Sequence, residues 1–187
     1  MYKLRKTIMF LILTFLTACG TGENSTPITS DSRFDMWEYM TSTQSYEVEY
    51  DVYENNVKTD FYVETHKQFG SKYERESSAG LTTLTLRSNA ILMDEPNENV
   101  NVVRFLYLDD ENIFQSPNIQ NCRLENFYEN YENRDLLFHN VLQVTCHLNS
   151  GDSQEIYYGY NEGIVAIVEK SSNLKTEYVK VGERQIN

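Results

Sequence analysis

Few side chains in this sequence have the chemistry for catalysis or metal binding. The three histidines are His66, His139 and His147, and none has a partner at the spacing that helices or turns use to build a metal site. Ser77 and Ser78 lack the Gly-x-Ser-x-Gly frame of a nucleophile elbow, and no glycine-rich phosphate loop is present. Carboxylates are abundant, but nothing selects one acid–base pair. We therefore expect no catalytic residues, no metal site and no cofactor, and we expect the chain not to be an enzyme.

The amino end of the chain has the organisation of a secretory signal. Lys3, Arg5 and Lys6 form a basic start, and an apolar run from residue 8 to residue 16 follows, interrupted by Thr14. A basic start, a short apolar core and small residues before the cleavage point are typical of a signal peptide. A membrane-spanning helix needs roughly 20 apolar residues, and this run is shorter.

The tetrad Leu16-Thr17-Ala18-Cys19 resembles the lipobox of bacterial lipoproteins. The resemblance implies cleavage before Cys19, acylation of the Cys19 thiol, for example with palmitate, and acylation of the new amino terminus. In the best-known sorting rule of these proteins, Asp after the cysteine retains them at the inner membrane, so Gly20 favours the outer membrane. The implied location is the bacterial cell envelope, lipid-anchored and facing the periplasm or the surface. The alternative is an ordinary signal peptide that ends in a chance cysteine.

Length and charge limit the number of domains and the kinds of partner. Removing residues 1–18 leaves 169 residues with 13 basic and 28 acidic side chains, a net charge of −15. We expect a signal peptide over 1–18, a lipidated cysteine and flexible tether over 19–31, and one globular domain over 32–187. A surface this acidic repels nucleic acid. The expected partners are therefore the membrane, through the lipid anchor, and a lipid, glycan or protein ligand.

Cys122 and Cys146 are the two cysteines that remain for the exported domain. In an oxidising compartment such a pair indicates a disulfide. The rival interpretation is a redox or metal site, but the chain has no Cys-x-x-Cys motif, and two thiols without well-spaced histidines make a poor zinc set. The sequence therefore predicts a disulfide between Cys122 and Cys146.

The domain begins with a predicted helix and continues mainly as strands. Ser32 to Met40 has a capping residue at its start and an apolar stripe of Phe34, Trp37 and Met40, so we expect a helix that docks on a sheet. Asn55-Asn56 is typical of a tight hairpin turn. Strands are predicted from alternation at 46–52, 57–66, 72–76, 81–87, 90–94, 100–108, 141–148, 154–160, 164–170 and 174–181. Residues 113–140 are expected to be an irregular excursion, with a short helix near 125–131.

These elements predict an α+β, mostly β fold: a curved antiparallel meander sheet, half-barrel-like, with one N-terminal helix. The later strands carry apolar residues on both faces, for example Ile156 and Tyr158 against Tyr157. Such strands need cover on both sides, from the helix or from the sheet curling over itself. This layout is similar to the lipoprotein-carrier and lipoprotein-receptor folds of the bacterial envelope. The similarity is one of layout only and assigns no site residue.

Tyrosine is unusually frequent, with fourteen residues. Tyrosine packs a flat apolar ring in a sheet and keeps a polar tip, so sheet packing alone is one explanation. The functional alternative is an aromatic concave surface for a lipid, glycan or peptide. Its candidate residues are Tyr46, Tyr50, Tyr62, Tyr107, Tyr157, Tyr158 and Tyr160.

Three roles follow from these observations. The first is a membrane-tethered binding or assembly module that is not catalytic. The second is a structural or surface envelope protein that works through protein–protein contacts. The third, which has the least support, is an envelope hydrolase.

Overall fold

The computed structural model describes residues 33–88, 90–96, 98–103, 105–107 and 113–186 of the chain. The predicted signal peptide, the lipobox, the tether and the proposed cap Ser32 lie outside the described residues, as does the side chain of Tyr107.

The described part of the chain contains one short helix and fourteen strands. In chain order these are β1 Arg33–Asp35, α1 Met36–Met40, β2 Tyr46–Glu54, β3 Val57–Phe69, β4 Lys72–Ser77, β5 Gly80–Leu86, β6 Ala90–Glu95, β7 Glu98–Val103, β8 Phe105–Tyr107, β9 Phe114–Gln115, β10 Ile119–Asn133, β11 Leu136–Leu148, β12 Ser153–Gly159, β13 Gly163–Lys170 and β14 Lys175–Gln185.

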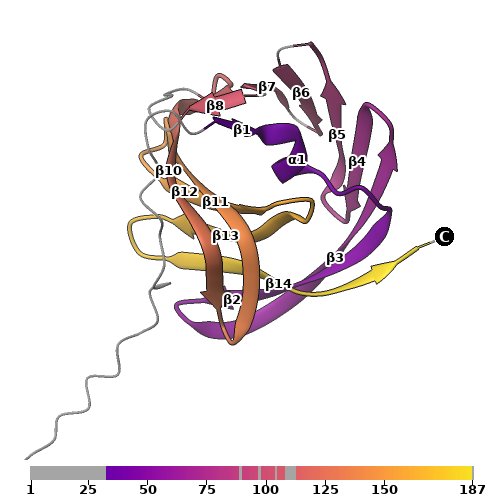
Figure 1. Cartoon of the computed structure of the whole chain (residues 1–187). Helices are drawn as coiled ribbons and strands as arrows, with labels where there is room; N and C mark the ends of the chain where they lie inside the picture. The colour runs from indigo at the N-terminus through magenta and orange to yellow at the C-terminus, as the bar shows by residue number, and fades with distance from the viewer. Residues whose placement is uncertain (1–32, 89, 97, 104, 108–112, 187) are drawn as a thin grey trace, which may run out of the picture.

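Twelve of these strands form one antiparallel sheet in the order β10-β11-β12-β13-β14-β2-β3-β4-β5-β6-β7-β9. Most neighbours in the sheet are also neighbours in sequence, and β14 joins the later strands to β2. The sheet curls until the Ile113 N–H donates to the Cys122 carbonyl at 3.1 Å, which brings the two edges of the sheet together. The strands therefore make a nearly closed ring around α1 (Figure 1). The predicted fold class, a mostly β, curved antiparallel meander with one helix, is confirmed.

Two-residue turns set the register of several hairpins. Asn55 and Asn56 both have positive φ angles, 47° and 70°, as the β2–β3 turn requires. Arg134 and Asp135 have the same left-handed geometry, with φ angles of 49° and 68°, between β10 and β11. The Asn55-Asn56 turn was predicted from its residue types. The turn at Arg134 was not, because arginine is uncommon at positive φ.

The helix is shorter than the sequence analysis predicted. Residues 33–35 form β1, which pairs with β8, and α1 begins at Met36 with Asp35 as its cap: the Trp37 N–H donates to Asp35 Oδ1 at 3.1 Å. The buried face of α1 is Met36, Tyr39 and Met40 rather than the predicted stripe of Phe34, Trp37 and Met40. Strand pairing of the first three residues thus moves the start of the helix and rotates its inward face.

The predicted irregular excursion at 113–140 is wrong. Most of it is β10, a strand of 15 residues that pairs with β11, and no helix forms at 125–131. A register shift between Leu124 and Asn126 interrupts the alternation of β10. Before the bulge the buried positions are even-numbered, Cys122 and Leu124, and after it the buried position is the odd-numbered Tyr131. A single period-2 pattern therefore cannot be followed along the segment.

The tip of the β10–β11 hairpin covers the outer face of the sheet. Asn140, with a φ angle of 52°, lies where β11 extends beyond the end of β12. The hairpin packs Tyr131 and Phe138 over Val165 and Val168 of β13. At the tip, the Arg134 guanidinium lies 3.6 Å from the centre of the Tyr53 ring and 2.8 Å from Glu177 Oε2. This hairpin supplies the second layer of cover that the apolar outer face of β12 and β13 requires.

Replacing Arg134 with alanine is expected to lower the free energy of unfolding by about 1–3 kcal/mol. Burial raises the pKa of Glu177, but hydrogen bonds from Asn133 and Arg134 outweigh it, so the net shift is downward and the carboxylate is charged. The variant removes the hydrogen bond from Arg134 and leaves this partly buried charge with fewer partners. Urea unfolding measures the change, with Lys67→Ala as the control because Lys67 and Glu76 form an exposed pair at 3.7 Å. Equal effects of the two substitutions would contradict a stabilising role for the hairpin tip.

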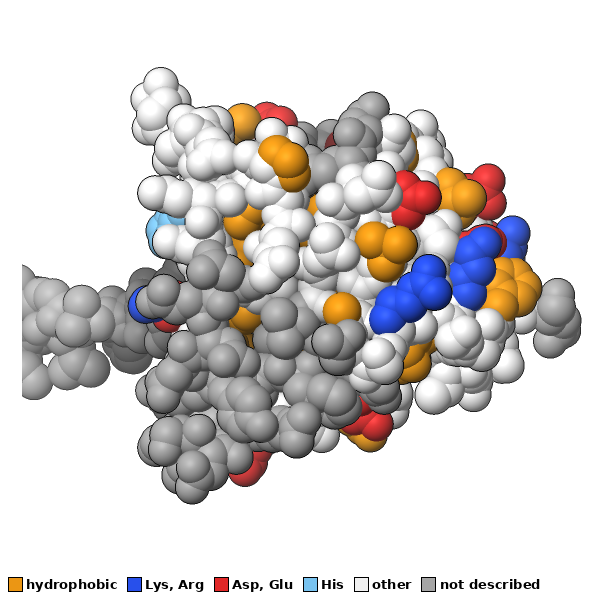
Figure 2. All heavy atoms as spheres, turned by 90° about the horizontal axis from the view of Figure 1, so that it is seen from above, with side chains coloured by type: hydrophobic (Ala, Val, Ile, Leu, Met, Phe, Trp, Pro, Cys, Tyr) orange, Lys and Arg blue, Asp and Glu red, His pale blue; other side chains and the backbone are white. Residues whose placement is uncertain are grey.

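Within the described ranges, no helix has the length and apolar composition that a bilayer crossing requires. On the side of the molecule shown in Figure 2, the described apolar side chains form small separate patches among polar atoms rather than one continuous field. Isolated apolar residues of this kind are normal on a protein surface.

Candidate ligand-binding site

A cavity of about 310 Å³ lies inside the curled sheet. The helix α1 occupies the end of the interior where β12 turns into β13: the Glu38 carbonyl accepts from the Asn161 N–H at 2.7 Å, and Tyr39 contacts Tyr160. The cavity lies toward the opposite end, where Leu148 and Gln154 flank the turn between β11 and β12. Its volume is near the lower end of the range for small-molecule sites, roughly 300–1,000 Å³.

Aromatic and aliphatic side chains form most of the cavity wall. The Tyr50 ring stacks on Tyr62 with 5.0 Å between ring centres, and the Tyr50 hydroxyl donates to the Ile164 carbonyl at 3.0 Å. Burial raises the pKa of Tyr50 and Tyr158 well above 10, so both stay uncharged. The apolar lining residues are Met93, Val100, Phe114, Ile119, Cys146, Leu148, Ile156, Ile164 and Ile167.

Three charged side chains line the same cavity: Arg75 of β4, Glu64 of β3 and Glu95 of β6. Burial lowers the pKa of Arg75, but Glu64 and the nearby tyrosines raise it more, so the guanidinium stays charged. Arg75 Nε is shielded from solvent and has no hydrogen-bond partner among the described residues. A buried donor without a partner costs free energy, and this one belongs to a side chain that lines the cavity.

A buried hydrogen-bonded network runs from the cavity toward α1. His66 Nε2 lies 2.8 Å from Glu64 Oε2, and His66 Nδ1 lies 2.7 Å from the Tyr73 hydroxyl. The Tyr73 and Tyr46 hydroxyls are 3.2 Å apart, and the Tyr46 hydroxyl donates to the Glu162 carbonyl at 3.0 Å. Residue types alone would allow a nucleophile–histidine–carboxylate set here. Tyr73 and His66 are only 0% and 1% exposed, however, so the network satisfies polar groups inside the core.

The pH dependence of stability is expected to contain a contribution from His66. Burial lowers the pKa of His66, and Arg75 and Lys180 add to this, while Glu64 opposes it; the net shift is downward from 6.5. The unfolded chain therefore takes up the proton first as the pH falls, and stability present above pH 6.5 is lost below it. Between pH 7.5 and 5.5 this loss is at most about 1.4 kcal/mol, the value of one pKa unit.

Urea unfolding at these two pH values, compared between the parent and His66→Gln, isolates that contribution. Burial raises the pKa of Glu64, but the hydrogen bond from His66 and the charge of Arg75 lower it more. The contribution of Glu64 is therefore lost only below pH 4.5, outside the measured interval. The parent should lose more stability than His66→Gln, and an equal loss in both proteins would contradict the assignment.

The seven tyrosines predicted as a ligand surface do not share one face. Tyr46, Tyr50 and Tyr158 are buried in the inner core, with Tyr62 packed against it, and the cavity is lined by Tyr50, Tyr62 and Tyr158. Tyr157 lies on the outer face, stacked on Tyr131 at 4.6 Å. Tyr160 is at the end occupied by α1 and contacts Tyr39. The backbone of Tyr107 belongs to β8.

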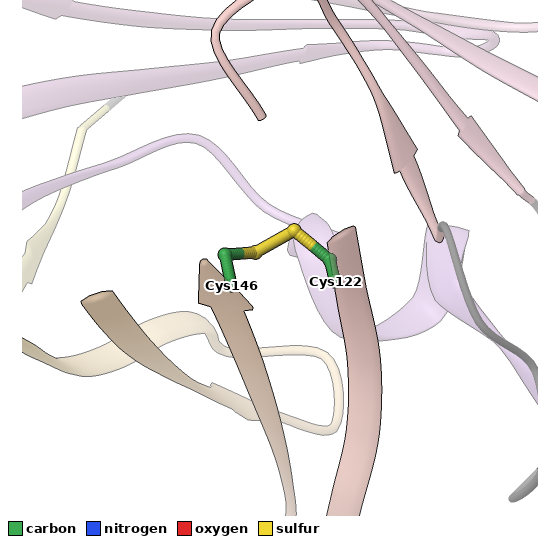
Figure 3. Close-up of a disulfide and its surroundings, with 2 residues drawn as sticks. All are labelled: Cys122 and Cys146. Carbon is green, nitrogen blue, oxygen red and sulfur yellow. A yellow bond between two sulfur atoms is a disulfide. The ribbon is translucent and has the colours of Figure 1, made fainter. Parts of the chain in front are cut away.

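The structure contains the predicted disulfide between Cys122 and Cys146 (Figure 3). The two residues lie directly opposite each other on β10 and β11, with 4.0 Å between their Cα atoms. Both are buried in the inner core, and Cys146 lines the cavity. The bridge therefore joins the edge strand of the sheet to its neighbour beside the candidate site.

Sequence reasoning missed the charged part of the cavity. Arg75 is two residues from Tyr73, and Glu64 is two residues from both Tyr62 and His66. Residues two apart in a strand share a face, so the period-2 pattern did place each of these charges on an inward face. That was the usable signal. The distance between Arg75 and Glu64 along the chain gave no reason to place them in one site. Elsewhere, His139 and His147 are exposed, and no group of three or more His, Cys, Asp or Glu side chains is arranged for a metal within the described ranges.

Comparisons with known proteins give similarity at the level of structure only. No protein-family model and no curated protein matches the chain. A Bacteroides fragilis protein, provisionally described as exported and with a YmcC-like fold, has a TM-score of 0.46 and 9% identity, covering 79% of this chain and 99% of its own. A Parabacteroides distasonis protein, provisionally described as a lipoprotein, has a TM-score of 0.43 and 10% identity, covering 78% of this chain and 97% of its own.

Proposed function

We propose that this chain is a non-catalytic, lipid-anchored protein of the bacterial envelope that binds a single acyl chain inside its curled sheet. The cavity beside Arg75 carries this proposal. It combines an apolar and aromatic wall with the buried guanidinium of Arg75, whose Nε has no hydrogen-bond partner among the described residues. Ligand sites in proteins typically have this composition, in which apolar walls provide affinity and a few polar groups fix orientation.

The charges in the cavity favour a neutral head group over an anionic one. Glu64 lies close enough to raise the pKa of Arg75, so its carboxylate already offsets the guanidinium charge, and a free carboxylate or phosphate would gain little attraction. An ester carbonyl carries no charge and would accept a hydrogen bond from the Arg75 guanidinium. Hydroxyl groups beside the ester would donate to Glu64. The ligand class is therefore a single-chain acyl ester, and a cavity of about 310 Å³ leaves no room for a lipid with several chains.

The amino end of the chain fits this role. In the proposal, acylated Cys19 holds the protein at the outer membrane, and the tether over 19–31 gives the domain a reach of roughly 20 Å. A net charge of −15 keeps the domain away from anionic head groups. The cavity is then close to the membrane that supplies acyl lipids without being buried in it.

The test is a binding comparison with residues 20–187, purified without detergent. Monodecanoylglycerol is titrated into the parent protein, Ile167→Trp and Leu137→Trp, and bound ligand is quantified by mass spectrometry after extraction. Ile167 lines the cavity, so a larger ring there removes volume, whereas Leu137 is 57% exposed on the outer hairpin. Ile167→Trp is expected to bind at least about tenfold less, a loss of about 1.4 kcal/mol, and Leu137→Trp is expected to bind like the parent.

Two results would overturn the proposal. Equal binding by Ile167→Trp and the parent would place the ligand outside the cavity. Decanoate binding more tightly than monodecanoylglycerol would contradict the neutral head group. Thermal unfolding of both variants shows whether each is folded before binding is compared.

A further inference from the structure

Part of one edge of β3 has no partner strand among the described residues. On one side, β2 pairs with β3 from Val57 to His66. On the other side, β4 pairs with it only from Thr65 to Phe69. Among the described residues, no strand pairs with that side of β3 between Val57 and Glu64. Exposed edges of this kind carry backbone groups that can pair with another chain.

The turn between β3 and β4 identifies the backbone groups on this edge. Phe69 and Lys72 flank a two-residue turn, so they exchange hydrogen bonds across the β3–β4 pair. Counting back in steps of two places the N–H and C=O of Val63 and Phe61 on the same side. The Phe61 N–H confirms this direction, because it donates to the side chain of Asp60 at 2.8 Å rather than to β2.

Apolar side chains stand beside the open edge on the outer face. Phe61 is 58% exposed and Val63 is 39% exposed. The neighbouring side chains of β3, Tyr62 and Glu64, point into the cavity instead, so the edge and the cavity are separate surfaces. An added strand would place alternate side chains against Phe61 and Val63 without entering the cavity.

The outer face next to this edge carries several carboxylates, of which Glu49 is the one without an ion pair among the described residues. Asp51 and Glu49 lie opposite Phe61 and Val63 on β2. A groove of about 330 Å³ continues from Val63 across β2 and β14; its lining residues are Glu47, Val48, Glu49, Val63, Gly182, Glu183 and Arg184. Three of these carboxylates form ion pairs: Asp51 with Lys58 at 2.6 Å, Glu47 with Arg184 at 2.8 Å and Glu183 with Lys180 at 2.8 Å. Glu49 forms no ion pair with the described residues.

We propose that the open edge of β3 takes up an extended basic segment of a partner protein as an added strand. Backbone hydrogen bonds to the N–H and C=O of Val63 and to the C=O of Phe61 supply the register. The carboxylate of Glu49 and the net charge of the domain favour lysine or arginine in the partner. A second copy of this chain fits poorly, because both copies would bring a net charge of −15. This binding surface is independent of the acyl-chain cavity.

The test uses two labelled 12-residue peptides, one alternating lysine and valine and one alternating glutamate and valine, added to residues 20–187. Binding is measured by fluorescence anisotropy, and hydrogen exchange reports the protection of single backbone amides. The lysine peptide is expected to bind, to lose affinity as salt rises and to protect the Val63 amide. The glutamate peptide is expected not to bind.

Val63→Pro is the decisive variant. The Val63 N–H faces the side of β3 that no strand in the described part of the chain pairs with, so proline removes the edge donor without breaking the β2–β3 ladder. It should weaken binding about tenfold relative to Val63→Ala, while thermal unfolding of the two variants stays similar. Equal binding by both variants, or protection at another edge, would overturn the proposal. Dimerisation of the domain that Val63→Pro abolishes would instead identify a second copy as the occupant and would also overturn it.

Discussion

Replacing Cys19 with serine is expected to release the protein from the membrane. In cells that express the full chain, the parent should pellet with membranes after lysis, and Cys19→Ser should leave the membrane pellet almost completely. The physical reason is that stable anchoring requires two or more acyl chains, each worth about 0.8 kcal/mol per buried methylene. Without the thiol there is no acyl chain at this position, and no helix of the described residues replaces it as a membrane span.

Mass spectrometry of the fractionated protein separates the lipid anchor from other causes. The parent should have the mass of residues 19–187 plus its acyl groups, and Cys19→Ser should lack the acyl mass. Thr21→Ser is the matched control, because it changes the same segment by one methyl group and keeps Cys19. If Cys19→Ser still pelleted with membranes at the normal processed mass, the lipid-anchor proposal would be wrong.

Removing the bridge between Cys122 and Cys146 is expected to lower the free energy of unfolding by about 3–4 kcal/mol in the chain-entropy model. The bridge closes a loop with a sequence separation of 24, and it ties the edge strand β10 to β11. The double variant Cys122→Ala/Cys146→Ala tests this by urea unfolding. Alanine is preferred to serine because both positions are buried, and a buried hydroxyl would add a cost of its own.

The parent protein measured with and without a reducing agent provides the second arm of that test. Reduction should shift the unfolding midpoint of the parent and leave the double alanine variant unchanged. Identical midpoints for the oxidised and reduced parent would show that the bridge contributes nothing to stability. The cavity is also expected to respond, because Cys146 lines it, so acyl-ester binding should fall together with stability.

The hairpins were predictable because their information is local. Asn55-Asn56 tolerates the positive φ angles of a two-residue turn, and alternation over Tyr46 to Glu54 marks one buried and one wet face. The same reasoning failed over residues 113–140. There a bulge near Leu124 shifts the alternation, and the turn at Arg134 lacks the usual residue types. The predicted start of the helix was wrong for another reason: β1 pairs with β8, about seventy residues away, and that pairing overrides a local capping signal.

The candidate site, too, could be predicted only in part from the sequence. Arg75, Glu64 and Tyr62 each follow the inward alternation of their strands, so the sequence indicates which side chains point inside. It does not indicate that β3, β4 and β6 curl around one cavity. Nor does it show that β4 stops pairing at Thr65 and leaves Phe61 and Val63 on an open edge. Both features depend on where neighbouring strands end relative to one another.

The sequence by itself determined the mostly β class, the order of most strands, the acidic surface and the pairing of Cys122 with Cys146, because residue type, alternation and cysteine number act locally or by count. Only the tertiary structure decided how far the sheet curls, that the β10–β11 hairpin folds over its outer face, and that Arg75 meets an apolar cavity. These features arise from contacts between residues far apart in the chain, where register shifts and strand lengths set which side chains meet.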